Sequence, residues 1–105
     1  MSKITEMLKR LCIRPNLRGY EYIQTAVKLV SEDREKIHRL TKVLYPEIGN
    51  HFDVTPESVE RAMRNAIYSG RCRAPEEYKD VFGHHYKPTT GEFISTIVEQ
   101  IREDQ

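Results

Sequence analysis

The sequence contains only two cysteines, Cys12 and Cys72, and neither has a cysteine nearby in the chain. A disulfide framework or a CxxC zinc site is therefore unsupported. Cys12 falls on an apolar helical stripe, which predicts a small core residue. The other candidate ligands, His51 and the adjacent pair His84 and His85, show no metal-ligand spacing, so we expect no metal and no cofactor.

Long apolar runs are also absent. No segment is long enough to cross a bilayer, and the first eleven residues lack the apolar stretch of a signal peptide. This predicts a cytoplasmic protein without membrane contact. The sequence has neither a nucleophile–base pair nor a phosphate-cradling glycine loop, so we expect no enzyme.

An excess of charge of one sign is missing too. Seventeen Lys and Arg residues against 16 Asp and Glu residues leave a net charge of +1, so a basic surface must arise by segregation along the chain. A length of 105 residues with 38% hydrophobic residues suits one globular domain with a modest core. No repeat, linker or low-complexity tract divides it.

Strand-like alternation is absent, whereas apolar residues recur at helical spacing in six segments. The expected helices cover about residues 4–12, 20–30, 31–48, 55–69, 74–82 and 89–101. Pro46 is expected to kink or split the third near Tyr45, which would make seven. Ser31 is expected to cap that third helix, and Gly70 to end the fourth. The sequence thus predicts an all-α, compact bundle of about six helices.

Several helix boundaries carry clear local signals. Thr55-Pro56-Glu57 combines a capping hydroxyl, a proline suited to the first helical position and an acidic first turn. Residues 89–92, Thr-Thr-Gly-Glu, form a capping box ahead of the last helix. Gly83 is expected to stop the fifth helix.

Residues 45–69 match the pattern of a helix-turn-helix. The first helix offers the apolar residues Ile48 and Phe52, with Gly49 where the two helices cross closest. Asp53 is expected to take the left-handed conformation in the turn, followed by Val54 as an apolar plug. The second helix would point back with its own apolar residues: Val59, Ala62 and Met63. The pattern alone fits a plain helical hairpin equally well.

The outward side of the second helix favours DNA binding. It carries Glu57, Glu60, Arg61, Arg64, Asn65, Tyr68 and Arg71. Arginine and asparagine are the residues that read guanine and adenine edges or hold phosphates. The alternative is a solvated face of i,i+4 pairs, such as Glu57–Arg61 and Glu60–Arg64. After the predicted turn, a recognition helix over about residues 56–69 is the better interpretation.

Further basic residues flank this helix. Arg71 and Arg73 follow it, and Lys87 lies in the loop 84–88, so we expect phosphate contacts from all three. The N-terminal segment is also basic, with Lys3, Lys9, Arg10, Arg14 and Arg18. A solvated charge run is the preferred interpretation for Lys3 and Lys9.

Four blocks together resemble a known family: Gly19–Tyr22, Thr41-Lys-Val-Leu-Tyr-Pro-Glu-Ile48, Val59-Glu-Arg-Ala-Met-Arg64 and Lys87–Ile94. The chain resembles, over nearly its whole length, the C-terminal effector domain of the sporulation master response regulator (stage 0 sporulation protein A) of endospore-forming Firmicutes. The resemblance implies a six-helix bundle whose helix-turn-helix binds promoter boxes in double-stranded DNA. It further implies that Arg61 and Arg64 read bases or hold phosphates, that Glu60 accepts from a cytosine amino group, and that tandem homodimers form on DNA.

The candidate DNA-binding residues are Ser58, Glu60, Arg61, Arg64, Asn65, Tyr68, Arg71, Arg73 and Lys87. The chain departs from the family at Asn65, where histidine is usual, and at Glu57-Ser58, where the family is more basic. The acidic tail, residues 102–105, also departs. These changes are expected to weaken or redirect box recognition.

Family members carry a receiver domain, and nothing in residues 1–105 can be one. This leaves a second interpretation: a receiver-less interaction module that pairs with a full-length relative or RNA polymerase and binds DNA weakly.

Overall fold

The computed structural model describes residues 2–83 and 87–103, and this part of the chain is helical without strands. The elements are α1 (Lys3–Arg10), α2 (Arg18–Glu32), a 3₁₀ turn η1 (Arg34–His38), a π turn η2 (Leu40–Leu44), α3 (Tyr45–Phe52), α4 (Pro56–Arg73), α5 (Pro75–Phe82) and α6 (Thr90–Glu103). The predicted all-α fold of about six helices is confirmed. None of these helices is long and apolar enough to cross a membrane.

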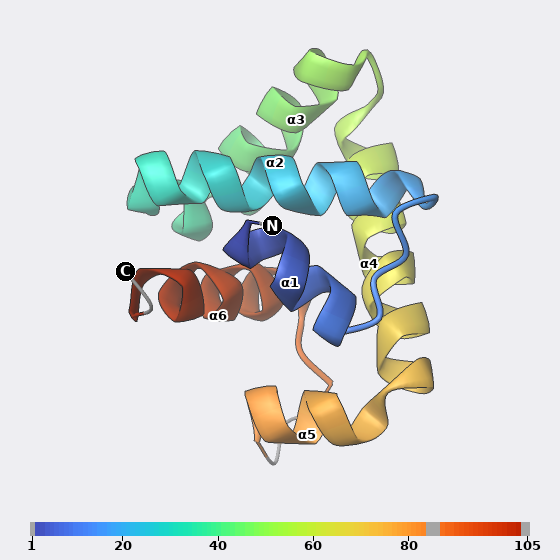
Figure 1. The fold of residues 1–105 in the computed structure, drawn as a ribbon. Helices are drawn as coiled ribbons and strands as arrows, with labels where there is room; N and C mark the ends of the chain where they lie inside the picture. The colour runs from blue at the N-terminus through green and yellow to red at the C-terminus, as the bar shows by residue number, and fades with distance from the viewer. Residues whose placement is uncertain (1, 84–86, 104–105) are drawn as a thin grey trace.

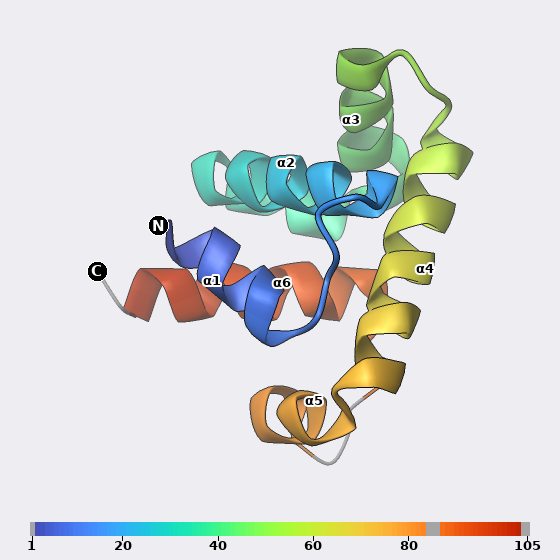
Figure 2. The same ribbon diagram turned by 45° about the vertical axis from the view of Figure 1, so that its right-hand side comes forward.

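Helix α4 forms one side of the molecule. It runs across the ends of α2 and α6, with α3 beside its first turns and α5 beyond its last (Figures 1 and 2). Helix α1 lies against α6. In both views no other helix covers the side of α4 that faces away from α2 and α6.

One hydrophobic core joins all the helices. Side chains with no exposed surface come from every α-helix and from η2: Leu8, Ile23, Leu44, Ile48, Met63, Tyr78 and Phe93. Each such side chain contributes about 1.5–3 kcal/mol relative to an exposed one. This core holds α4 in place from several directions.

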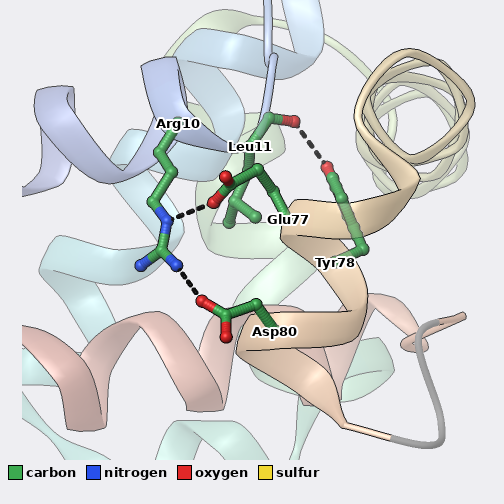
Figure 3. Close-up of polar contacts among 5 residues, drawn as sticks. All are labelled: Arg10, Leu11, Glu77, Tyr78 and Asp80. Carbon is green, nitrogen blue, oxygen red and sulfur yellow. Dashed lines mark hydrogen bonds and ion pairs between the residues drawn. The ribbon is translucent and has the colours of Figure 1, made fainter.

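Polar contacts join α1 to α5 (Figure 3). The Arg10 guanidinium donates to Glu77 and Asp80 on α5, and the buried Tyr78 hydroxyl donates to the Leu11 carbonyl oxygen at 2.8 Å. The ion pairs are solvent-exposed, so each contributes little. The Tyr78 bond satisfies a carbonyl at the end of α1, and burial raises the pKa of Tyr78.

The helix starts predicted from capping residues, at Thr55 and Thr89, are confirmed. Thr55 accepts from the Ser58 amide at 3.1 Å, and Thr89 and Glu92 form the reciprocal bonds of a capping box at 3.1 and 2.9 Å. Helix α5 ends before Gly83, as predicted.

The predicted end of α4 at Gly70 is wrong, because the helix continues to Arg73. Gly70 is buried where α4 meets the end of α1, and a Cβ there would overlap the Leu11 carbonyl oxygen and the Tyr78 hydroxyl. The glycine therefore permits a close crossing instead of ending the helix.

The predicted helix over residues 31–48 is broken into η1, η2 and α3. Ser31 does not begin it, since α2 continues to Glu32 and Asp33 caps η1 by accepting from the Glu35 amide at 3.2 Å. The split near Tyr45 is confirmed, because α3 begins there with Pro46 in its first turn.

The prediction that Cys12 is a helical core residue is also wrong. Helix α1 ends at Arg10, and Cys12 is half-buried with a left-handed backbone, φ 55°. The Cys12 amide donates to the Lys9 carbonyl at 3.1 Å and the Ile13 amide to the Leu8 carbonyl at 2.9 Å. This is the Schellman motif that ends many helices, with cysteine where glycine is usual.

Candidate nucleic-acid interface

The turn between α3 and α4 has the geometry that the sequence predicted. Asp53 adopts a left-handed backbone, φ 58° and ψ 47°, and the Val54 amide donates to the Gly49 carbonyl at 2.9 Å. Val54 is half-buried against the core. Aspartate is one of the few residues besides glycine that visit this conformation readily.

The turn folds back tightly over α3. A Cβ on Gly49 would lie 2.6 Å from the Val54 carbonyl oxygen, so the predicted need for a small residue is confirmed. The close neighbour is the backbone of the turn, not α4 itself. Phe52 packs on Tyr22 of α2, with ring centroids 5.1 Å apart.

The inner side of α4 is held by two helices. Val59 and Met63 are fully buried, as predicted. Ala62 is half-buried, and its carbonyl lies so close to Gly19 that a Cβ on that glycine would overlap it. Helix α2 therefore orients α4 together with α3. The sequence did not predict this contact between α2 and α4.

The outward face of α4 is the exposed surface formed by Ser58, Arg61, Arg64, Asn65 and Tyr68. Arg61 and Asn65 have no side-chain partner within residues 2–83 and 87–103. At about 100° per residue, Arg61 lies at the centre of this face. Its guanidinium and the Asn65 amide therefore remain available to an external ligand.

The expected i,i+4 pairs form only in part. Arg64 Nη1 lies 3.1 Å from Glu60 Oε1, whereas Arg61 makes no such pair with Glu57 among the described residues. Glu60 is half-buried beside Tyr45. Burial raises the pKa of the Tyr45 phenol, and the Glu60 charge raises it further. Glu60 thus pairs with one arginine, and the central one has no partner among the described residues.

A groove of about 460 Å³ separates one flank of α4 from the start of α6. It brings together five of the predicted residues: Glu60, Arg64, Tyr68, Arg71 and Lys87. The Arg71 guanidinium carbon stands 5.1 Å from the centre of the Tyr68 ring, a cation–π arrangement that orients the half-buried arginine.

Sequence reasoning missed the other wall of this groove. Thr89 and Thr90, at the start of α6, line it, and the Thr90 side chain acts on the Tyr45 phenol by lowering its pKa against the effects of burial and Glu60. The capping box at residues 89–92 is visible in the sequence, but nothing local places it beside α4.

Arg73 lies apart from the other predicted residues. It lines a second cavity on the opposite flank, together with Arg14 and Lys9, where the α1–α2 connection runs beside α4 (Figure 2). The predicted set therefore forms an outward face with two separate basic flanks. Ser58 also takes part in the N-terminal cap, since its hydroxyl accepts from Thr55 Oγ1 at 2.8 Å.

Residues 84–86 of the predicted loop around Lys87 lie outside the described residues, and with them the pair His84 and His85. Within the described chain, no three His, Cys, Asp or Glu side chains are grouped to hold a metal ion. Lys87 itself is exposed.

Comparison with protein families identifies a model that matches the chain. The model described as sporulation initiation factor Spo0A C terminal matches residues 4–101, which is nearly the whole chain.

Proposed function

The chain belongs to the sporulation initiation factor Spo0A C-terminal family, a DNA-binding regulatory domain of a response regulator, and on that premise we propose that it is a sequence-specific transcription regulator. Helix α4 would lie in the major groove of double-stranded promoter DNA. One observation carries the proposal: Arg61 and Asn65 project from a helix side that no other helix covers, without partners among the described residues.

The residue types suggest which side chains would contact DNA bases and which would contact the DNA backbone. Arg61 suits a guanine edge and Asn65 an adenine edge, since each presents paired hydrogen-bonding groups in one plane. Arg64 would contact a base or phosphate beside them, held by Glu60, whose second oxygen suits a cytosine amino group. Ser58 and Tyr68 complete the outward face.

The flanks suit phosphates. Arg71 and Lys87 border the groove on one side of α4, and Arg73 lies on the other, so the two sets would contact backbones on either side of the major groove. These contacts would position α4 without reading sequence. The same proposal includes binding of two copies of the chain to adjacent boxes and a cytoplasmic location.

The second candidate is an interaction module that pairs with RNA polymerase or a full-length relative and binds DNA weakly. It is favoured by Glu57, which is exposed in the first turn of α4, where a carboxylate would approach DNA phosphates.

A fluorescence-anisotropy titration separates the two candidates. Labelled duplexes carrying promoter boxes of the family type are compared with scrambled duplexes of equal length at two salt concentrations. We expect the boxes to bind at least about tenfold more tightly, and both affinities to fall with salt through counterion release. Equal binding of both duplexes at low salt would reject the transcription-regulator proposal. Sedimentation of the chain with RNA polymerase would then test the second candidate.

A further inference from the structure

The cavity beside Arg73 has the features of a ligand site. It lies between the end of α1, the α1–α2 connection and the last turn of α4, is open to solvent, and has a volume of about 470 Å³. Small-molecule sites commonly occupy about 300–1,000 Å³ and combine an apolar lining with a few polar groups.

Three cations converge on this cavity without compensation. Lys9, Arg14 and Arg73 line it, no carboxylate does, and none of the three has an ion-pair partner in the described chain. Arg10 and Arg34, by contrast, are each paired with a carboxylate, on Glu77 and Glu99. The cavity therefore presents positive charge that no carboxylate of its lining offsets.

Helix dipoles explain part of this charge but not all of it. Lys9 and Arg73 lie in the last turns of α1 and α4, where a cation is favoured. Arg14 belongs to no helix and gains no such stabilisation. Its exposed guanidinium is therefore available to an anion that enters the cavity.

The rest of the lining is mostly apolar, with the Thr5 hydroxyl as its polar exception. Ile13 is buried, and with Pro15 and the half-buried Tyr20 ring it forms the surface between the cations. A phosphate ion or a DNA backbone would neutralise the charge but leave this apolar surface exposed to water. A ligand with an apolar body and one carboxylate would both cover the apolar surface and neutralise the charge.

We propose that this cavity, the anion cavity, binds a small amphipathic carboxylate, with the carboxylate at Arg14, Lys9 and Arg73 and the apolar body on Ile13, Pro15 and Tyr20. The walls are rigid, because the Schellman motif holds Cys12 and Ile13 against α1 and Gly70 packs α4 on Leu11. Arg73 is the one residue that this site shares with the DNA contacts proposed above.

The test uses the ¹⁵N-labelled full chain without DNA, titrated separately with octanoate, octanol and inorganic phosphate and followed by amide chemical shifts. We expect saturable shifts with octanoate at Ile13, Arg14, Tyr20 and Arg73. Octanoate should bind at least about tenfold more tightly than either octanol or phosphate, as one charge-assisted hydrogen bond implies.

Arg14→Ala should weaken octanoate binding about tenfold and leave octanol unchanged. Arg39→Ala removes the same charge from an exposed position outside the cavity and should change neither. Arg14 is exposed, so the variant should fold, and an unchanged thermal midpoint checks this. Lys9→Ala provides a second variant from α1.

The proposal is overturned if octanoate causes no saturable shift, if octanol or phosphate binds as tightly, or if Arg39→Ala weakens binding as much as Arg14→Ala. It is also overturned if octanoate does not bind while Arg14→Ala weakens a scrambled duplex. In that case the cluster is a phosphate contact. Because the main titration contains no DNA, its result stands whether or not the chain recognises promoter boxes.

Discussion

Cys12 and Asp53 are the two non-glycine residues with positive φ among the described positions, at 55° and 58°. Each follows the end of a helix, where the chain reverses through a left-handed residue. Aspartate can offset the steric cost with local hydrogen bonds, whereas cysteine cannot. The two positions therefore differ in strain although their backbones are alike.

Cys12→Gly should stabilise the protein by about 0.5–1 kcal/mol, because relief of left-handed strain exceeds the extra entropy of an unfolded glycine. Asp53→Gly is the matched control and should gain less. Urea unfolding of the three proteins measures the difference. A loss of stability in Cys12→Gly would show that packing of the half-buried thiol outweighs the strain.

Arg61→Ala should weaken binding to promoter boxes by about 1–3 kcal/mol and relax specificity at one base position, because a bidentate guanine contact would be lost. Anisotropy titrations against single-position box variants measure both effects. Arg39→Ala serves as the charge-matched control. If affinity falls equally for every sequence, Arg61 contacts phosphate and reads no base.

Tyr78→Phe should lower the free energy of unfolding at neutral pH by about 1–2 kcal/mol, because the Leu11 carbonyl loses its buried donor. Burial raises the pKa of Tyr78 in the folded state above its ordinary value of 10.0. Its stabilising contribution is therefore complete below the unfolded pKa and is lost as the pH rises above it.

The difference between wild type and Tyr78→Phe should accordingly stay constant from pH 7 to about pH 10 and shrink above about pH 10. Urea unfolding at several pH values measures it. Tyr68→Phe alters an exposed phenol and should follow the wild-type curve. A pH-independent difference would contradict the assignment to Tyr78.

At the scale of elements, close crossings decide where α4 lies. Gly19 meets the backbone of α4 from α2, and Gly70 meets Leu11 at the end of α1. Neither glycine has a positive φ. Each therefore acts through its lack of a side chain, which lets the two backbones approach closely. Helix α4 thus has fixed contacts near its middle and near its C-terminal end.

Gly70→Ala should destabilise the protein by about 1–3 kcal/mol through overpacking, although alanine gains about 1 kcal/mol of helix propensity. Gly91→Ala is the matched control in α6. Its Cβ would meet only the end of the Leu40 side chain, at 2.9 Å, which can move, so stability should stay level or rise. Thermal unfolding compares the two. Equal effects would mean that the crossing at Gly70 tolerates a methyl group.

The helix starts that are capped by local hydrogen bonds were predictable, whereas the start at Ser31 and the end at Gly70 were predicted wrongly. Thr55 and Thr89 cap through hydrogen bonds within three residues, so the local sequence contains the whole signal. Gly70 was misread because glycine serves equally as a helix stop and as a packing gap. Only the position of Leu11 and Tyr78 against α4 distinguishes the two.

For the whole molecule, the charge is nearly balanced at +1, yet cations gather around α4. Arg71 and Lys87 border one flank, and Arg73 with Arg14 and Lys9 borders the other. Near neutrality limits long-range attraction to DNA, so affinity should depend on these local groups.

Arg71→Ala should weaken specific and scrambled duplexes alike and reduce the salt slope of log K by about 1, because one phosphate contact is lost. Anisotropy at four salt concentrations measures the slope. Lys42→Ala, an exposed lysine on η2, is the control and should leave the slope unchanged. A slope unchanged by Arg71→Ala would remove this residue from the phosphate contacts.

The sequence by itself determined the helical class, the capped starts of α4 and α6, the left-handed turn at Asp53 and the family. These depend on residues close together in the chain, where periodicity and capping act. The tertiary structure alone decided that Arg73 separates from Arg71 and that the start of α6 lines the groove. It also decided that Glu60 pairs with Arg64, while Arg61 has no partner in the part of the chain that the structure describes. These depend on packing between distant segments, which the burial of one shared core directs.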